Sequence, residues 1–160
     1  MKIMTTDEIK DLDGIALDAA CARALGWKVF ASHSVLEQTS YTMLVKGTNS
    51  PIYLVYDCEH PNDVNITVPL VMYEKSVDKG WWTPHYDIST AYELIKKTGK
   101  PFLWTLSCDY SGSSVWHKVE ARWNWNNAVT GEGPTLPIAI CRAFLLAMNV
   151  REKDNQRIKK

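Results

Sequence analysis

Residues 115–125 alternate between apolar and polar side chains more regularly than any other part of the chain. One set of alternate positions carries apolar side chains and a single histidine, whereas the other set is mostly charged or polar. Because successive side chains of a β-strand point to opposite faces of its sheet, this period of two predicts a strand with one buried face. Residues 102–108 predict a second strand, and residues 109–112 predict the turn between the two. Strands joined by so short a turn pair antiparallel.

A helix in two pieces is predicted before these strands. Thr5 and Glu8 have the spacing of a capping box, in which two side chains reciprocally satisfy the first backbone N–H groups of a helix. Residues 13–14, an Asp-Gly pair, interrupt this helix, and apolar residues recur at helical spacing over residues 15–25. Gly26 supplies the positive φ that a helix C-terminus favours, so we expect the helix to end there.

Two further helices are predicted from their caps and apolar stripes. Asp87 begins a helix that runs to about residue 98, and Thr135 begins one over residues 135–148. The expected buried stripes are Ile88, Ala91, Tyr92 and Ile95 in the first helix and Ile138, Cys141, Leu145 and Met148 in the second.

Additional strands are predicted between the first two helical regions. Residues 41–46, 52–57 and 64–72 are rich in β-branched and aromatic side chains, and residues 28–31 predict a short fourth strand. The turn-forming residues 47–51 suggest a hairpin. Pro69 is incompatible with a central position, so the 64–72 strand lies at the edge of a sheet or stops early. Residues 80–86 and 131–134 are predicted loops because of their glycines and prolines.

This order of elements predicts an α+β fold in one domain, with a mostly antiparallel sheet sandwiched between helices. We place the domain at residues 1–150 and a charged, flexible tail at residues 151–160. The chain is 46% hydrophobic and 22% charged, which is an ordinary globular composition and excludes disorder of the whole chain.

Charge, hydropathy and cysteine usage limit the partners and the compartment. Basic and acidic residues number 18 each, so the chain lacks the basic excess of a protein that binds duplex nucleic acid. No apolar run approaches the length of a membrane span, and residues 1–8 do not resemble a signal peptide. None of the four cysteines has CxxC spacing. We therefore expect a reduced cytoplasmic location without membrane association.

Three segments together resemble the phage αβα-sandwich domain family, whose members are encoded by phages and prophages. Residues 17–27 end in Gly-Trp like the first helix of that family, and residues 134–147 give the most specific match. Residues 86–95 are similar to its central helix, although Ser89-Thr90 is shifted relative to Asp87. The resemblance implies an αβα sandwich and a phage origin, hence the cytoplasm of a host cell. It brings no catalytic residues. Residues 39–80 are longer than the usual connection in the family.

The sequence offers no recognisable catalytic or metal-binding motif. The four histidines are well separated, and Cys58-Glu59-His60 provides only two metal ligands. Neither a GxSxG sequence nor a phosphate-binding glycine loop is present. We therefore expect no catalytic residues, no metal and no cofactor. One alternative stays open, in which Asp109, His117 and Glu120 converge across the last hairpin as an acid/base group.

Tryptophan is the unusual feature of the composition, because six of the seven lie between residues 81 and 125. We assign Trp104, Trp123 and Trp125 to the core. Trp27 follows Gly26 and is expected to fold back onto the preceding helix. The remaining three are candidates for stacking on a planar ligand or for anchoring in a partner protein, because they lie in a loop or beside cations. The predicted ligand-binding residues are Trp81, Trp82, His85, Tyr86, Trp116, Lys118 and Arg122.

Together with the phage origin that the resemblance implies, these observations favour a non-catalytic binder that counters host defence by sequestering a nucleotide-like signal. In this hypothesis the aromatic side chains stack on the ligand, and arginine and lysine contact phosphate. Two alternatives remain: an inhibitor that binds a host defence protein through its exposed aromatic loop, and a small hydrolase that acts on a nucleotide. A further hypothesis is a structural or self-assembling phage protein that forms a homo-oligomer.

Overall fold

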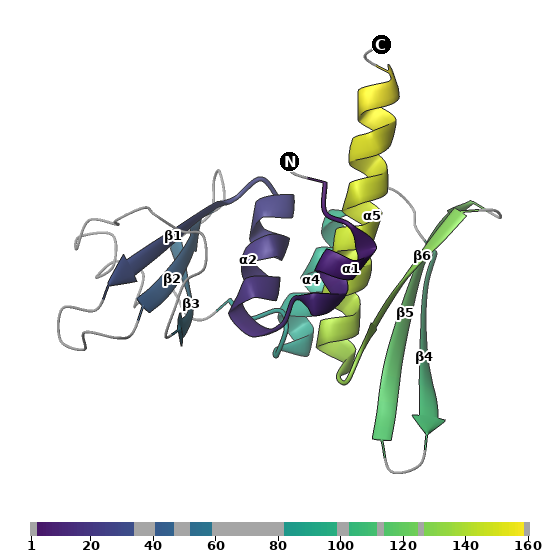
Figure 1. The fold of residues 1–160 in the computed structure, drawn as a ribbon, viewed down its shortest axis with the longest axis horizontal. Helices are drawn as coiled ribbons and strands as arrows, with labels where there is room; N and C mark the ends of the chain where they lie inside the picture. Colours follow the sequence, from purple (N-terminus) through teal and green to yellow (C-terminus); the bar gives the residue numbers. More distant parts are fainter. Residues whose placement is uncertain are drawn as a thin grey trace.

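The computed structural model describes residues 3–33, 41–46, 52–58, 82–98, 103–111, 114–124 and 127–158 (Figure 1). The described helices are α1 (Thr6–Asp11), α2 (Gly14–Ala24), α4 (Ile88–Lys97) and α5 (Leu136–Ile158). The described strands are β1 (Lys28–His33), β2 (Tyr41–Lys46), β3 (Ile52–Cys58), β4 (Leu103–Ser111), β5 (Ser114–Asn124) and β6 (Asn127–Gly133).

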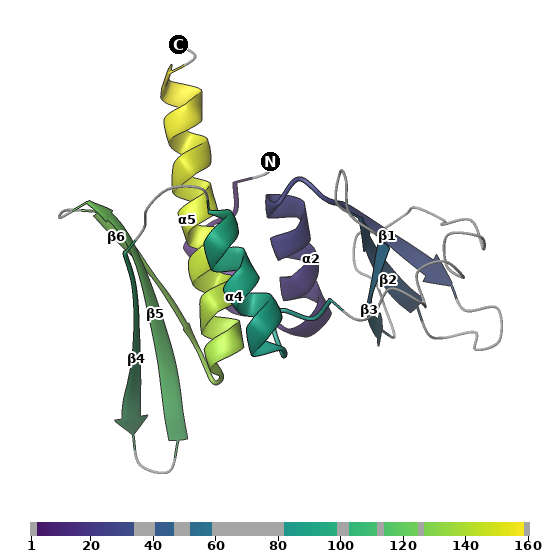
Figure 2. The same cartoon turned by 180° about the vertical axis from the view of Figure 1, so that it is seen from behind.

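The strands form two antiparallel sheets, in the orders β1-β2-β3 and β4-β5-β6. Figures 1 and 2 show the helices between these sheets, with α5 next to β4-β5-β6 and α2 next to β1-β2-β3. The predicted α+β class and antiparallel pairing are thus confirmed. The described residues show three-stranded sheets packed against helices and do not by themselves show the finer expectation, a sheet sandwiched between helices.

The N-terminal helices begin and end where the sequence predicts. Glu8 N–H donates to Thr5 Oγ1 at 3.1 Å while Thr5 N–H donates to the Glu8 carboxylate at 2.5 Å, which completes the capping box. At the end of α2, Gly26 adopts φ 77°. Gly26 N–H donates to the Arg23 carbonyl and Trp27 N–H to the Ala22 carbonyl, each at 2.9 Å. This pair of bonds is a Schellman motif, and it turns Trp27 back towards the helix as expected.

The predicted strands before residue 59 are confirmed, and β1 is two residues longer than expected. The strand predicted at residues 64–72 lies outside the described residues.

The β4–β5 hairpin is longer than predicted. Pairing continues to Ser111 opposite Ser114, so residues 109–111, which we expected in the turn, belong to β4. The Asp109 carboxylate contacts Lys118 Nζ on β5 at 2.5 Å. Its side chain therefore joins the two strands instead of capping a turn.

The sequence analysis missed β6 and assigned part of it to a loop. A Cβ atom on Gly131 would lie 2.2 Å from the Ala143 nitrogen and 2.3 Å from the Ala139 carbonyl oxygen, both in the backbone of α5. A Cβ on Gly133 would lie 2.7 Å from the Ile138 side chain. These glycines therefore permit close contact between a strand and a helix, whereas glycine in a sequence more often indicates a turn.

The long helix α5 begins as predicted but ends ten residues later. Ile138 N–H donates to Thr135 Oγ1 at 3.4 Å, which supports the expected cap. The helix passes Met148 and continues to Ile158, so residues 151–158 of the expected flexible tail are helical. Arg151 fixes part of this extension by donating to the Thr98 carbonyl at 3.2 Å.

The buried faces of α4 and α5 differ in part from the expected stripes. In α4 the buried side chains are Ala91 and Leu94, whereas the expected Ile88 and Tyr92 are 37% and 41% exposed. Along α5, most residues from 138 to 147 are buried, because the helix contacts β5 and β6 on one side and the other helices on the other. No described helix is long and apolar enough to cross a membrane.

Replacing Gly131 with alanine should destabilise the fold strongly, because the new methyl group would overlap the α5 backbone. We expect a loss of about 1–3 kcal/mol or more in the free energy of unfolding. Urea denaturation followed by circular dichroism measures this loss. Thr130→Ala, an exposed substitution next to it on β6, should change the free energy by less than about 0.5 kcal/mol. Equal effects of the two substitutions would contradict the close contact between β6 and α5.

Candidate functional site

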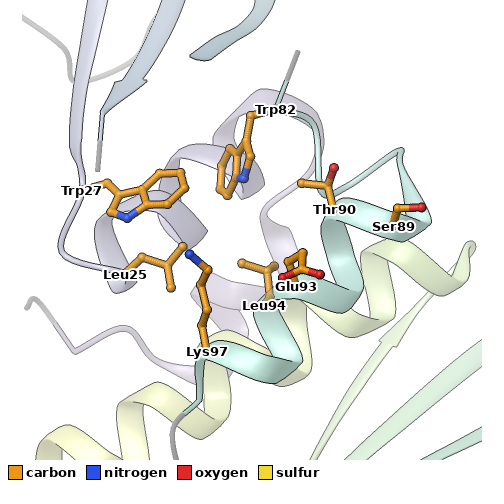
Figure 3. Close-up of a pocket in the computed structure, with 8 residues that line it drawn as sticks. All are labelled: Leu25, Trp27, Trp82, Ser89, Thr90, Glu93, Leu94 and Lys97. Carbon is orange, nitrogen blue, oxygen red and sulfur yellow. The ribbon is translucent and has the colours of Figure 1, made fainter. Parts of the chain in front are cut away.

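A pocket of about 390 Å³ lies between the C-terminal end of α2, the segment before α4, and α4 itself (Figure 3). Two indole rings line one part of it, and three consecutive turns of α4 contribute the opposite part. The lining residues are Leu25, Trp27, Trp82, Ser89, Thr90, Glu93, Leu94 and Lys97. We call this the Trp27–Trp82 pocket.

The two indole rings contact each other. Their centroids lie 5.1 Å apart with an interplanar angle of 46°. Trp82 is only 7% exposed and belongs to the hydrophobic core, against which Trp27 packs. A flat ring cannot enter between indoles that are this close. A planar ligand would therefore stack on an outer ring face or along a ring edge.

The polar lining comes from one face of α4. Lys97 Nζ lies 5.2 Å from the Trp27 ring centroid, in a cation–π contact. Figure 3 shows Lys97 and Trp27 at one end of the pocket and the hydroxyl groups of Ser89 and Thr90 at the other. Glu93 lies between them, and its carboxylate accepts a hydrogen bond from Lys96 at 2.6 Å. The pocket thus carries a positive charge at one end and a carboxylate in the middle.

The first turn of α4 is capped by Asp87. Its carboxylate accepts bonds from the N–H groups of Ser89 and Thr90, at 3.2 and 2.9 Å, and from the Thr90 hydroxyl. The hydrogen bonds from Thr90 hold the pKa of Asp87 below its usual range. The Ser89 and Thr90 N–H groups are therefore occupied by the cap, and their side chains remain as the polar groups at this end.

A buried ion pair fixes the segment that carries Trp82. The Asp18 side chain on α2 is fully buried. Its carboxylate accepts a hydrogen bond from the His85 backbone N–H at 2.9 Å, and its other oxygen lies 2.6 Å from His85 Nδ1. The hydrogen bond to Asp18 raises the pKa of His85. Burial raises the pKa of Asp18 more than the contacts with His85 lower it. This pair joins α2 to the turn before α4, and these two elements hold the indole rings.

The structure divides the predicted ligand-binding residues into separate groups. Trp82 lines the pocket, and His85 holds the segment in place. Tyr86 is 79% exposed, with its ring centroid 6.4 Å from that of His85. Trp81 lies outside the described residues.

Trp116, Lys118 and Arg122 lie on β5, on the other side of α5 from the pocket (Figure 2). Trp116 is 40% exposed. Lys118 pairs with Asp109 and Glu132, and the hydrogen bond to Asp109 raises the pKa of Lys118. Arg122 donates to Glu120 through two nitrogens, at 3.1 and 2.8 Å. The predicted residues therefore do not form one surface, and the two cations are already paired.

The three residues of the possible acid/base group do not converge. Asp109 binds Lys118, and Glu120 binds Arg122, both on the outer face of the sheet. His117 lies on the opposite face of β5, where its Nδ1 is 3.3 Å from Cys108 Sγ. Among the described residues, no three histidine, cysteine or acidic side chains are close enough together to hold a metal ion.

Of the tryptophans assigned to the core, Trp104 packs against a buried cluster and Trp123 is partly buried, whereas Trp125 lies outside the described residues.

Among the lining residues of this pocket, sequence analysis predicted only Trp82 as ligand-binding and missed the five that α4 contributes. Thr90, Glu93, Leu94 and Lys97 repeat at helical spacing and so share one face of α4. The expected apolar stripe did not include this mixed face. Asp18 stands alone among apolar residues of α2, and a charged residue in such a place indicates a buried partner.

Comparison with known proteins found no matching family model, no matching curated protein and no matching solved structure.

Replacing Asp18 with asparagine should change how stability depends on pH. The pKa of His85 is raised from 6.5, so its stabilising effect is complete below that value and is lost as the pH rises through the higher folded pKa. The pKa of Asp18 is also raised, from 3.8, so this group too makes the free energy of unfolding fall as the pH rises, but at lower pH. We expect the wild-type free energy of unfolding to fall as the pH rises from 6.5 through the raised pKa of folded His85, and Asp18→Asn to reduce this slope. Urea denaturation at several pH values measures it.

Asp154→Asn, at an exposed acid of α5, is the matched control and should keep the wild-type slope. An unchanged slope in Asp18→Asn would show that the buried pair does not contribute.

Proposed function

We propose that the protein is a non-catalytic binder that holds a nucleotide-like molecule in the Trp27–Trp82 pocket. The observation that carries the proposal is the presence of two indole rings and the Lys97 ammonium group around one pocket of about 390 Å³. That volume lies within the range of about 300–1,000 Å³ that is typical of small-molecule sites.

The stacking surface fits a nucleobase. Stacking of a base on an aromatic side chain contributes about 1–3 kcal/mol and tolerates any base. Because the indoles are too close together to enclose a ring, the base stacks on one of them. When it covers the Trp27 face, it displaces the Lys97 ammonium group, which then contacts the phosphate.

The charges limit the ligand further. Lys97 is the cation among the lining residues, and Glu93 is an acceptor that suits the amino groups of a base. One cation beside one carboxylate favours a ligand of low charge, such as a nucleoside monophosphate or a cyclic nucleotide, over a triphosphate.

The lining residues support binding without turnover. Those that the structure describes include neither a cysteine nor a histidine, and the Thr90 hydroxyl donates to the Asp87 cap. Neither a thiol nor an imidazole therefore lines the described part of the pocket as a nucleophile or a base.

In its wider setting, we propose a phage-encoded accessory protein of αβα-sandwich type that sequesters a nucleotide-like signal of host defence in the host cytoplasm. The support is the resemblance of residues 17–27, 86–95 and 134–147. Inhibition of a host protein is the second candidate, favoured by Tyr86, which is 79% exposed in the segment before α4.

Substitution of two neighbouring lysines, one at a time, tests whether the pocket binds the phosphate. Lys97→Gln should weaken binding of a nucleoside monophosphate about ten- to a hundredfold, because the lost contact is one charge-assisted hydrogen bond worth about 1.5–3 kcal/mol. Lys96→Gln is the matched control, since Lys96 pairs with Glu93 but does not line the pocket. Isothermal titration calorimetry gives both dissociation constants. Equal affinities of the two variants would contradict the proposed position of the phosphate.

Recovery of the ligand tests whether the protein is a binder or a hydrolase. After incubation and denaturation, chromatography should return the nucleotide intact. A product that accumulates beyond one equivalent per protein chain would establish turnover and contradict a non-catalytic function.

A further inference from the structure

Cys108 and His117 face each other across the β4–β5 hairpin. They are directly opposite in the strand register, and Cys108 Sγ lies 3.3 Å from His117 Nδ1. Cys108 is exposed, and His117 is partly buried. This distance is within reach of a hydrogen bond to sulfur, so the imidazole can accept the proton of the thiol.

Apolar side chains surround this pair on the same face of the hairpin. Leu106 and Tyr110 lie two residues on either side of Cys108, and Val115 lies two residues before His117. They are 40%, 79% and 38% exposed, respectively. Figures 1 and 2 show the reason: the closed end of the hairpin projects beyond the start of α5, whereas the part of β5 near Val119 is covered.

Two other cysteines provide a contrast. Cys21 and Cys141 are completely buried, and burial raises the pKa of Cys21 well above its usual range. Those thiols pack as small apolar side chains. Cys108 combines exposure with a neighbouring base, which is the arrangement that makes a thiol reactive.

We propose that Cys108 and His117 form a reactive thiol site that exchanges with disulfides carrying apolar or aromatic groups. The imidazole, in the tautomer with its proton on Nε2, accepts the thiol proton at Nδ1 as Sγ attacks one sulfur of the disulfide R–S–S–R. The S–S bond of the reagent breaks, and a new bond joins Cys108 Sγ to one RS group. The departing thiolate takes the proton from His117 and leaves as RSH, so Cys108 is oxidised as one RS group is reduced.

The apolar surroundings define the substrate class. The charged groups next to the pair in sequence, Asp109 and Lys118, lie on the opposite face and neutralise each other. Leu106, Tyr110 and Val115 therefore offer contact with an uncharged aromatic or aliphatic group beside the reacting sulfur.

The test measures exchange of the intact protein with dithiodipyridine, a neutral aromatic disulfide that releases a product with strong near-ultraviolet absorbance. Peptide mapping by mass spectrometry identifies the labelled cysteine. We expect labelling at Cys108, loss of that label in Cys108→Ser, and a rate constant about tenfold lower in His117→Gln. Thr105→Ala, at an exposed position on the opposite face of β4, should retain the wild-type rate.

A second variant addresses the apolar surroundings. Tyr110→Ser should slow exchange with dithiodipyridine several-fold and change exchange with the charged glutathione disulfide less. Equal slowing with both reagents would overturn the proposed substrate class.

A wild-type measurement keeps the test decisive if His117→Gln does not fold. Labelling of Cys108 in the native protein should be faster than labelling of the same residue in urea, where His117 is no longer held beside it. Native labelling that is no faster than in urea, label on other cysteines only, or a folded His117→Gln with the wild-type rate would each overturn the proposal.

Discussion

Contact between the backbone of β6 and the backbone of α5 is the constraint on which the arrangement of this protein depends. Gly131 leaves no room for a side chain, so the helix lies closer to the strand than side chains would permit. The same helix contacts α1, α2 and α4 on its other side. Arg142 of α5 then connects both sides, since it donates to the Glu132 carbonyl of β6 at 2.7 Å and to the Leu12 carbonyl after α1 at 3.0 Å. The position of α5 therefore sets the positions of the other helices.

The Trp27–Trp82 pocket is a consequence of this packing. The end of α2 brings Trp27 into place through a Schellman motif, and α4 presents its mixed face towards it. Residues 82–87, directly before α4, must hold Trp82 against the core without a helix or strand of their own. The buried pair of Asp18 and His85 provides that restraint, since the Asp18 carboxylate is hydrogen-bonded to both the backbone N–H and the ring Nδ1 of His85. The two indole rings are therefore held in place by the fold before a ligand binds. This lowers the conformational entropy that the protein loses on binding.

Local signals in the sequence were sufficient for the caps, the helix starts and the antiparallel hairpin. Gly26 is an example, because a positive φ at a helix end depends on neighbouring residues alone. Gly131 is the opposite case: its role depends on a helix that follows in the chain, so the sequence suggested a loop. The site was predicted only in part, because most of its residues depend on contacts between elements that are distant in the chain. Trp82 was identified by its loop, but Asp18 and Lys97 acquire their roles only when α2, α4 and the intervening segment meet. Likewise, the register that places Cys108 opposite His117 follows from the length of a hairpin that was predicted too short.

Nuclear magnetic resonance of the indole N–H groups tests the binding site most directly. Each tryptophan side chain gives one such signal, and substitution of single tryptophans assigns them. The account predicts that a saturating nucleoside monophosphate shifts the signals of Trp27 and Trp82, which line the pocket, and leaves that of Trp116 on β5 unchanged. A shift of the Trp116 signal with unchanged Trp27 and Trp82 signals, or no shift of any of them, would contradict it.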